Sequence, residues 1–208
     1  MNERKWDLYS LFYNVLLKTV ENERRHLYRN LALHPNVPLD VYVPGCGTGL
    51  DFPYLPAKSR VLGIDFSQKM LEKAEKQAGK LTLPPLSLQI QLRRSYAELS
   101  DLPDNSKDLV ILHLILAVTE RPQDLLNEAV RVLKPGGIVS VWDKFLPDDR
   151  QASCLRRYLN TITTKLATSI NLQVGPLLAN LPVRIIRREF RLAGLMQHLI
   201  LQKTFEDL

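Results

Sequence analysis

The chain has 208 residues, of which 45% are hydrophobic and 24% charged, the composition of an ordinary globular protein. This length supports one sizeable domain. No apolar run reaches the roughly 18 residues of a membrane-spanning helix. The N-terminus carries charged residues and lacks the apolar stretch of a signal peptide, so we expect a cytoplasmic protein. Two cysteines make neither a disulfide framework nor a zinc-binding pattern, so no metal is expected.

The net charge is +6, and much of the positive charge lies in the last quarter of the chain. The arginines concerned are Arg156, Arg157, Arg184, Arg187, Arg188 and Arg191. Such a basic region can attract anionic lipid or a phosphorylated substrate, although a simply solvated surface remains an alternative. Because no aromatic-rich basic segment accompanies it, the sequence does not favour nucleic acid as a partner.

Helical and extended patterns follow one another along the chain. Apolar residues at helical spacing predict one or two amphipathic helices over 3–33, ending before Pro35. Strands are then predicted at 39–43, 60–64, 86–92, 107–116 and 138–142, and helices at 67–80, with Ser67 as N-cap, and at 121–133. Beyond residue 150, we expect a helix at 155–167, irregular structure at 168–182, and an antiparallel pair formed by 183–190 and 197–203. Strands that alternate with helices predict a parallel sheet with right-handed crossovers.

A glycine-rich loop follows the first predicted strand, with Gly45, Gly47 and Gly49 at alternate positions. Ligands of open α/β sheets bind beyond the carboxyl ends of the strands, and glycines let the backbone approach a ligand closely. Asp65 ends the second strand, twenty positions after Gly45, where a carboxylate can accept hydrogen bonds from both hydroxyls of a ribose. The loop and Asp65 therefore predict a nucleotide-like ligand, with a solvated aspartate as the alternative.

The loop lacks the G-x-G-x-x-G spacing of dinucleotide-binding proteins. Four segments in order (41–49, 63–71, 102–110 and 131–137) instead resemble the class I S-adenosylmethionine-dependent methyltransferases. The resemblance implies a Rossmann-like three-layer α/β/α sandwich whose mostly parallel seven-stranded sheet ends in an antiparallel C-terminal strand pair. It also implies one domain over 1–208, with a helical lid at 1–36, a cofactor-binding core at 37–145, and a C-terminal helix and strand pair at 146–208.

The resemblance assigns a cofactor site for S-adenosyl-L-methionine. The loop would hold the methionine part of the cofactor, Asp65 the ribose, and Phe66 and Met70 the adenine, although core packing is an alternative for these two. The cofactor-binding candidates are Gly45, Cys46, Gly47, Thr48, Gly49, Asp65, Phe66, Met70, Tyr96, Ala97 and His113.

Two positions depart from the family pattern. Val43 stands where an acidic residue usually precedes the glycines, and Tyr96 stands where an aspartate often contacts the adenine. A hydrogen bond to a charged group is worth about 1.5–3 kcal/mol, so these changes should weaken cofactor binding unless other groups replace the carboxylates. They keep open a second class of function, a non-catalytic cofactor-binding regulatory or partner subunit.

Three residues are candidates for the catalytic side of the pocket. His113 ends the fourth predicted strand, and Tyr9 and Tyr13 lie on the first predicted helix, where they would cover the pocket. Packing in the core is the alternative for all three.

The identity of the methyl acceptor depends on weaker similarities. Segments 9–14, 141–147, 166–171 and 184–190 resemble bacterial phosphatidylethanolamine N-methyltransferases. This resemblance implies a lipid-headgroup substrate and peripheral contact of the basic C-terminal region with an anionic membrane. Segment 43–47 is similar to small thiol methyltransferases, so a thiol or another soluble metabolite remains an alternative acceptor.

Overall fold

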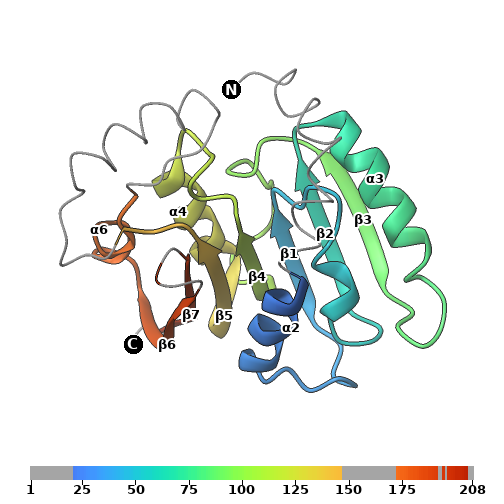
Figure 1. Ribbon diagram of the computed structural model, residues 1–208, viewed down its shortest axis with the longest axis horizontal. Helices are drawn as coiled ribbons and strands as arrows, with labels where there is room; N and C mark the ends of the chain where they lie inside the picture. Colours follow the sequence, from blue (N-terminus) through green and yellow to red (C-terminus); the bar gives the residue numbers. More distant parts are fainter. Residues whose placement is uncertain (1–20, 147–171, 192–193, 195, 206–208) are drawn as a thin grey trace. The chain divides into compact units, whose positions relative to one another are not determined.

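The computed structural model describes residues 21–146, 172–191, 194 and 196–205, coloured by position in Figure 1. Its helices are α2 (Glu21–Asn30), the 3₁₀-helix η1 (Phe52–Tyr54), α3 (Gln68–Gly79), α4 (Pro122–Val132) and α6 (Val174–Leu178). Its strands are β1 (Asp40–Pro44), β2 (Arg60–Asp65), β3 (Gln89–Arg94), β4 (Lys107–His113), β5 (Leu133–Asp143), β6 (Val183–Arg191) and β7 (Met196–Lys203). None of the helices in these residues is both long and apolar enough to cross a membrane.

The strands form one seven-stranded sheet in the order β3-β2-β1-β4-β5-β7-β6. Strand β1 runs parallel to β2 and to β4, and β2 runs parallel to β3. Strand β7 is antiparallel to both of its neighbours, β5 and β6. The predicted fold class, with its antiparallel C-terminal pair, is confirmed.

The chain divides into two compact units, of which the first comprises the residues up to Leu102 together with Lys107–Val110. In it, α3 begins where the sequence predicts: the Ser67 hydroxyl accepts a hydrogen bond from the amide of Met70 at 3.3 Å, which satisfies one of the free N–H groups of the first turn. The helix packs against β2 and β3 and buries Met70, Leu71, Ala74 and Ala78. These contacts support the sheet beside the glycine loop.

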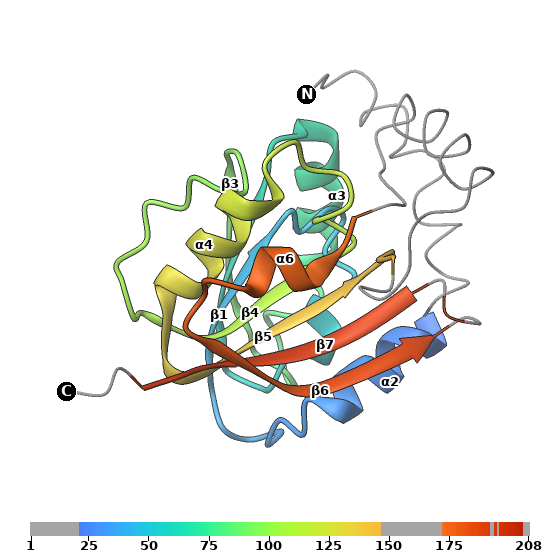
Figure 2. The same cartoon turned by 90° about the vertical axis from the view of Figure 1, so that its left-hand side faces the viewer.

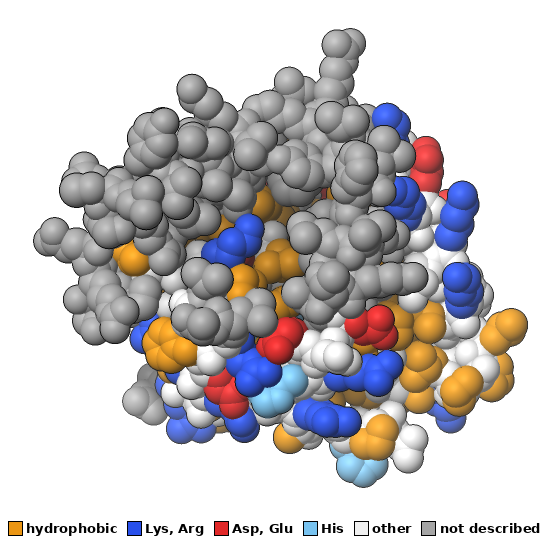
Figure 3. Space-filling model, viewed as in Figure 1, with side chains coloured by type: hydrophobic (Ala, Val, Ile, Leu, Met, Phe, Trp, Pro, Cys, Tyr) orange, Lys and Arg blue, Asp and Glu red, His pale blue; other side chains and the backbone are white. Residues whose placement is uncertain are grey.

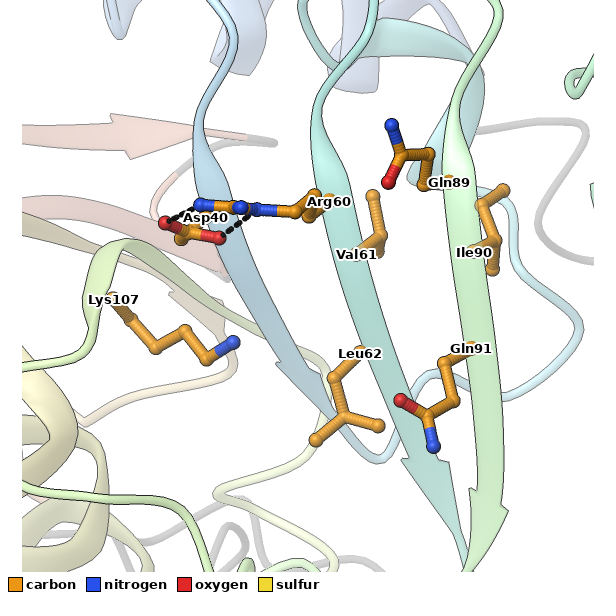
Figure 4. Close-up of a pocket in the computed structure, with 8 residues that line it drawn as sticks. All are labelled: Asp40, Arg60, Val61, Leu62, Gln89, Ile90, Gln91 and Lys107. Carbon is orange, nitrogen blue, oxygen red and sulfur yellow. Dashed lines mark hydrogen bonds and ion pairs between the residues drawn. The ribbon is translucent and has the colours of Figure 1, made fainter.

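A hollow of about 390 Å³ lies along the first half of β2 and β3, near the starts of β1 and β4, as Figure 4 shows. The Arg60 guanidinium crosses it to the carboxylate of Asp40, with two nitrogen–oxygen distances of 2.7 Å. Gln89 and Gln91 pair in register with Arg60 and Leu62, so all four share one face of the sheet. Ligands of open α/β sheets bind at the opposite ends of the strands, so this hollow is not the candidate site.

The second unit comprises Pro103–Ser106 and the residues from Ile111 onward. Figure 2 shows its β6–β7 hairpin in front of β5. Helix α4 buries an apolar stripe formed by Leu125, Leu126, Ala129, Val130 and Val132. The Lys203 ammonium on β7 donates to the carbonyl oxygens of Val130 and Leu133, at 2.9 and 2.8 Å, and so satisfies acceptors at the end of this helix.

Several elements differ from those predicted, among them β3, which spans Gln89–Arg94 and not 86–92. Strand β5 begins at Leu133 and not at residue 138, because Gly136 takes a φ of 78° that lets the extended chain continue through the Pro-Gly-Gly segment. Strand β4 ends at His113, since Leu114 turns to a φ of 61° and donates its N–H to the carbonyl of Trp142. The short helix α6 interrupts the stretch expected to be irregular, where it buries Val174 and contacts α4.

Candidate functional site

The glycine loop joins β1 to η1 with all three of its glycines in the left-handed region. Their φ angles are 64°, 55° and 76° at Gly45, Gly47 and Gly49. An L-residue with a side chain pays about 1–2 kcal/mol in this region. At Gly49 there is a second constraint, because a Cβ would lie 2.7 Å from the ring of Phe52. The loop therefore needs glycine for its path, and its backbone lies at the carboxyl end of β1.

Asp65 connects the end of β2 to this loop. One carboxylate oxygen accepts the N–H of Gly47 and the other accepts the N–H of Ser67, both at 2.9 Å. The residue is only 9% exposed, and this burial raises its pKa to about 6, against the opposing effect of the backbone N–H groups. The structure thus brings together the two features that the sequence singled out, an acid and a glycine loop.

Two aromatic rings lie beyond Asp65. Phe66 and Tyr96 are stacked, with ring centroids 6.2 Å apart and planes inclined by 6°, and the Tyr96 side chain is half exposed. The turn that carries Tyr96 is held by a buried residue of β1, since the Tyr42 hydroxyl donates to the carbonyl of Ala97 at 2.7 Å. Flat ring faces are surfaces on which a purine base can stack. Met70, in contrast, is 2% exposed and packs within the core, so its contact with a cofactor stays a prediction.

Cys46 and Thr48 are both buried within the loop. The Cys46 amide donates to the carbonyl of Ile64 at 2.9 Å, which fixes the loop to β2. Burial, followed by the nearby carboxylates of Asp65 and Asp51, raises the pKa of the Cys46 thiol well above its ordinary value. A raised pKa favours the protonated thiol, which is the less reactive form of a cysteine side chain.

A buried polar cluster beside the loop escaped the sequence analysis. Asp51 accepts hydrogen bonds from the Arg24 guanidinium at 3.2 Å and from the Tyr28 hydroxyl at 3.1 Å, and Tyr54 stacks on Tyr28 with centroids 5.1 Å apart. Arg24 is 4% exposed and Asp51 7%. Burial raises the pKa of Tyr28 well above its ordinary value, so the tyrosine is a donor and not an anion. The only sequence signal for the Arg24–Asp51 ion pair is that each charged residue stands among apolar neighbours in the sequence.

His113 belongs to the second unit, where it ends β4 and is 7% exposed. Its Nε2 atom lies 2.9 Å from the Ser140 hydroxyl, and its ring meets the ring of Trp142 edge-on at 5.9 Å. The buried Asp143 ends β5 and accepts the N–H groups of Ala117 and Lys144 at 2.9 and 2.8 Å. Burial raises the pKa of Asp143, and its hydrogen bonds fix the turn that follows β4. The other two catalytic candidates, Tyr9 and Tyr13, lie outside the described residues.

The donors and acceptors of the first unit fit a nucleoside cofactor. A carboxylate at the end of β2 suits ribose hydroxyls, two flat rings suit a base, and the open loop backbone suits the amino-acid part of the molecule. Neither Val43, which is buried, nor Tyr96 supplies a carboxylate, as the sequence indicated.

Comparison with known proteins agrees with this geometry. A family model described as a methyltransferase domain matches residues 39–141, about half of the chain. Phosphatidylethanolamine N-methyltransferase of Cereibacter sphaeroides is 29% identical over 163 residues, which cover 76% of each chain. A thiol S-methyltransferase of Rattus norvegicus is 29% identical over 149 residues, which cover 68% of this chain but only 59% of that relative.

A solved structure shows the same fold. It is a SAM-dependent methyltransferase from Aquifex aeolicus with a TM-score of 0.64 and 18% identity, and the match covers 89% of this chain and 92% of that structure. The family, its cofactor and the fold therefore agree with what the four ordered sequence segments imply. The chain belongs to the S-adenosylmethionine-dependent methyltransferases of Rossmann-like fold.

Proposed function

We propose that this methyltransferase transfers its methyl group to the amine of an ethanolamine lipid headgroup at an anionic membrane surface. The observation that carries the proposal is the exposed strand β6, which combines four arginines with exposed apolar side chains. Its Ile185 and Ile186 are each 47% exposed and Phe190 is 54% exposed. The similarity to a phosphatidylethanolamine N-methyltransferase along three quarters of both chains supports the same substrate class.

The chemistry of β6 suits a lipid surface. The Arg188 guanidinium lies over the ring of Phe190 at 5.8 Å, and Arg184 donates to the Gln202 amide oxygen, so β6 presents guanidinium groups next to an exposed aromatic ring. Glu189 pairs with Arg187 and cancels only part of the strand's positive charge. Figure 3 shows basic side chains with hydrophobic ones among them over the region where Figure 1 draws β6 and β7.

In this proposal, S-adenosylmethionine supplies an electrophilic methyl group on its sulfonium. The residues of the chain bind and orient: the Asp65 carboxylate accepts from the ribose hydroxyls, Phe66 and Tyr96 flank the base, and the loop from Gly45 to Gly49 holds the methionine part. The amine must be neutral to attack, and each transfer leaves a proton on the nitrogen. Placing donor and acceptor in line supplies most of the rate.

The test is methyl transfer from radiolabelled S-adenosylmethionine to vesicles. One preparation contains phosphatidylethanolamine with an anionic lipid, and a matched one replaces the ethanolamine lipid with phosphatidylcholine, which has no free amine. We expect label in the lipid phase of the first preparation only. Label that enters small thiols and leaves the lipid untouched would reject the lipid acceptor.

A thiol acceptor is the second candidate. It is favoured by the similarity to a thiol S-methyltransferase, although that match covers 59% of the relative's length. A non-catalytic binding subunit is the remaining class. Calorimetry distinguishes it, because such a subunit would bind S-adenosylmethionine yet methylate neither lipids, amines nor thiols.

A further inference from the structure

We propose that Tyr42 is a positioning residue for the cofactor, whose buried hydroxyl holds the turn formed by residues 95–99 so that the ring of Tyr96 meets the adenine base. This turn is called the Tyr96 turn below. All the residues concerned belong to the first compact unit. The inference rests on the place that the proposed function gives to the base, beside Phe66 and Tyr96, and not on the nature of the methyl acceptor.

Tyr42 lies on β1, the strand that leads into the glycine loop. It pairs in register with Leu62 on β2 and with Val110 on β4, and its side chain is fully buried. Strands on both sides therefore fix the backbone of Tyr42, and close packing fixes its ring. A hydroxyl on such a side chain is a rigid point from which a neighbouring turn can be held.

The Tyr96 turn is part of the connection between β3 and β4, residues 95–106. All residues of this connection are described, and none of them is helical. The turn depends instead on individual hydrogen bonds. Two of these bonds close it on itself: the Leu99 amide donates to the carbonyl of Tyr96 at 3.1 Å, and the Ser95 hydroxyl donates to the carbonyl of Leu99 at 3.2 Å.

Two further hydrogen bonds attach the turn to the sheet, one on each side of Tyr96. Before it, the Ser95 amide donates to the carbonyl of Asp65 at the end of β2, at 3.1 Å. After it, the carbonyl of Ala97 accepts the Tyr42 hydroxyl of β1 at 2.7 Å. The backbone of Tyr96 is therefore held between two strands, and Tyr42 supplies one of the two attachments.

The contact proposed for Tyr96 depends on where its ring is held. The side chain is half exposed, and its ring is inclined by only 6° to that of Phe66. Tyr96 brings no carboxylate to the base, so its contribution is the face of its ring. The attraction between stacked rings depends on their distance and inclination, and a shift of the backbone at Tyr96 changes both.

The Tyr42 hydroxyl acts before the cofactor binds. A turn that already has its bound geometry loses little conformational freedom on binding, whereas a loose turn must be ordered at a cost in affinity. Ala97 is only partly buried, so water can replace the hydroxyl at its carbonyl. Loss of the hydroxyl should therefore loosen the Tyr96 turn without unfolding the unit.

The turn is measured first, by hydrogen exchange in the absence of cofactor. Tyr42→Phe removes one oxygen atom and keeps the buried ring. We expect the Ser95 and Leu99 amides to exchange about three- to tenfold faster than in wild type, the factor that one net hydrogen bond is worth. Tyr28→Phe removes another buried tyrosine hydroxyl of the unit, one that donates to Asp51, and should leave both amides as they are.

Binding is measured second, by calorimetric titration with S-adenosylmethionine and without a methyl acceptor. Tyr42→Phe should bind the cofactor about three- to tenfold more weakly. Tyr96→Ala should bind it about five- to a hundredfold more weakly, the range for loss of an aromatic ring stacked on a base. Tyr96→Phe keeps the ring and should bind nearly as wild type.

Combined substitutions show whether Tyr42 acts through Tyr96. In a Tyr96→Ala background there is no ring to position, so Tyr42→Phe should weaken binding little further, as expected for coupled residues. Tyr28→Phe should cause the same fold-change in both backgrounds.

A truncated ligand tests a rival route, in which Tyr42 acts along β1 on the glycine loop. Methylthioadenosine keeps the base and the ribose but lacks the amino-acid part that the loop would hold. The loss caused by Tyr42→Phe should persist with this ligand. Its disappearance would assign the effect to the loop and overturn the inference.

The other outcomes separate this inference from the proposed function. Unchanged amide exchange or unchanged cofactor binding in Tyr42→Phe would overturn the inference, as would an undiminished effect of this substitution in the Tyr96→Ala background. Wild-type binding by Tyr96→Ala would reject the proposed place of the base, and the role of Tyr42 with it. Because no measurement needs a methyl acceptor, rejection of the lipid acceptor would leave the role of Tyr42 standing.

Discussion

If Asp65 holds the ribose, as we propose, its burial makes cofactor binding depend on pH. Its two oxygens accept hydrogen bonds from the Gly47 and Ser67 amides, which lower its pKa, but burial outweighs them and raises the pKa to about 6. A raised pKa means that the folded protein favours the protonated acid. The resulting contribution to stability is complete below the unfolded pKa, near 4, and is lost as the pH rises through about 6. At neutral pH, Asp65 is therefore ionised at some cost in stability, in the form that the proposed ribose contact requires.

The first prediction follows from that ionisation. We expect the affinity for S-adenosylmethionine to fall about tenfold per pH unit below about pH 6, since only the carboxylate accepts from both ribose hydroxyls. Asp65→Asn should bind about ten- to a hundredfold more weakly at pH 7.5, the equivalent of about 1.5–3 kcal/mol, and should lose most of the pH dependence. Calorimetric titration between pH 5 and about 8 measures both effects. Asp101→Asn, whose side chain is 87% exposed, is the control and should behave as wild type.

At the scale of elements, α2 is attached to the segment that follows the glycine loop. The link is the Arg24–Asp51 ion pair together with the Tyr28 hydroxyl, and both charged side chains are at most 10% exposed. Removing one partner of such a pair leaves an uncompensated buried charge, which typically costs about 3–5 kcal/mol. The neighbouring Arg25 also pairs with an acid, Glu21, but with both side chains about half exposed or more.

The second prediction compares these two arginines of one helix. Arg24→Ala should lower the free energy of unfolding by about 3–5 kcal/mol. Arg25→Ala should lower it by less than about 1 kcal/mol, because exposed pairs contribute little. Denaturant titration of both variants gives the two values. Equal losses would mean that the buried pair does not fasten α2 to the loop.

At the scale of the whole molecule, the effect of the net charge of +6 depends on where the arginines lie. Strand β6 is an edge strand of the sheet, and a register irregularity between Ile185 and Arg187 interrupts its pairing with β7. Such irregularities and charges protect an edge from pairing with other chains. Under the proposed function, the same arginines would attract anionic lipid, at about 1 kcal/mol for each basic residue near the surface.

The third prediction tests that distribution. Replacing Arg184, Arg187 and Arg188 by glutamine should weaken binding to vesicles containing anionic lipid about a hundredfold, since about 3 kcal/mol is lost. A matched variant with Lys69, Lys76 and Lys80 changed to glutamine removes the same charge from α3 and its C-cap. Vesicle co-sedimentation at low and high salt measures the difference, and salt should release the wild type. Equal weakening by both variants would show that net charge alone, without a docking strand, determines binding.

Much of the fold and part of the candidate site could be read from local patterns. The N-cap at Ser67, the short alternating strands and the loop of Gly45, Gly47 and Gly49 all depend on residues close in sequence. Asp65 could be paired with that loop because parallel strands bring their carboxyl ends to one edge. The early start of β5 was missed, since Pro-Gly-Gly is typical of a turn, whereas here Gly136 takes a φ of 78° within an extended segment.

The sequence by itself therefore determined the class of fold, because hydrophobic periodicity and glycine torsions act over a few residues, and the resemblance of four ordered segments indicated the family and its cofactor. Only the tertiary structure decided which buried polar groups became partners. Ser140 meets a histidine 27 positions before it and another 58 positions after it, and Arg24 meets Asp51 across 27 positions. Nothing local encodes such pairs: burial deprives each group of water, and the tertiary structure brings it polar neighbours that replace the lost hydrogen bonds.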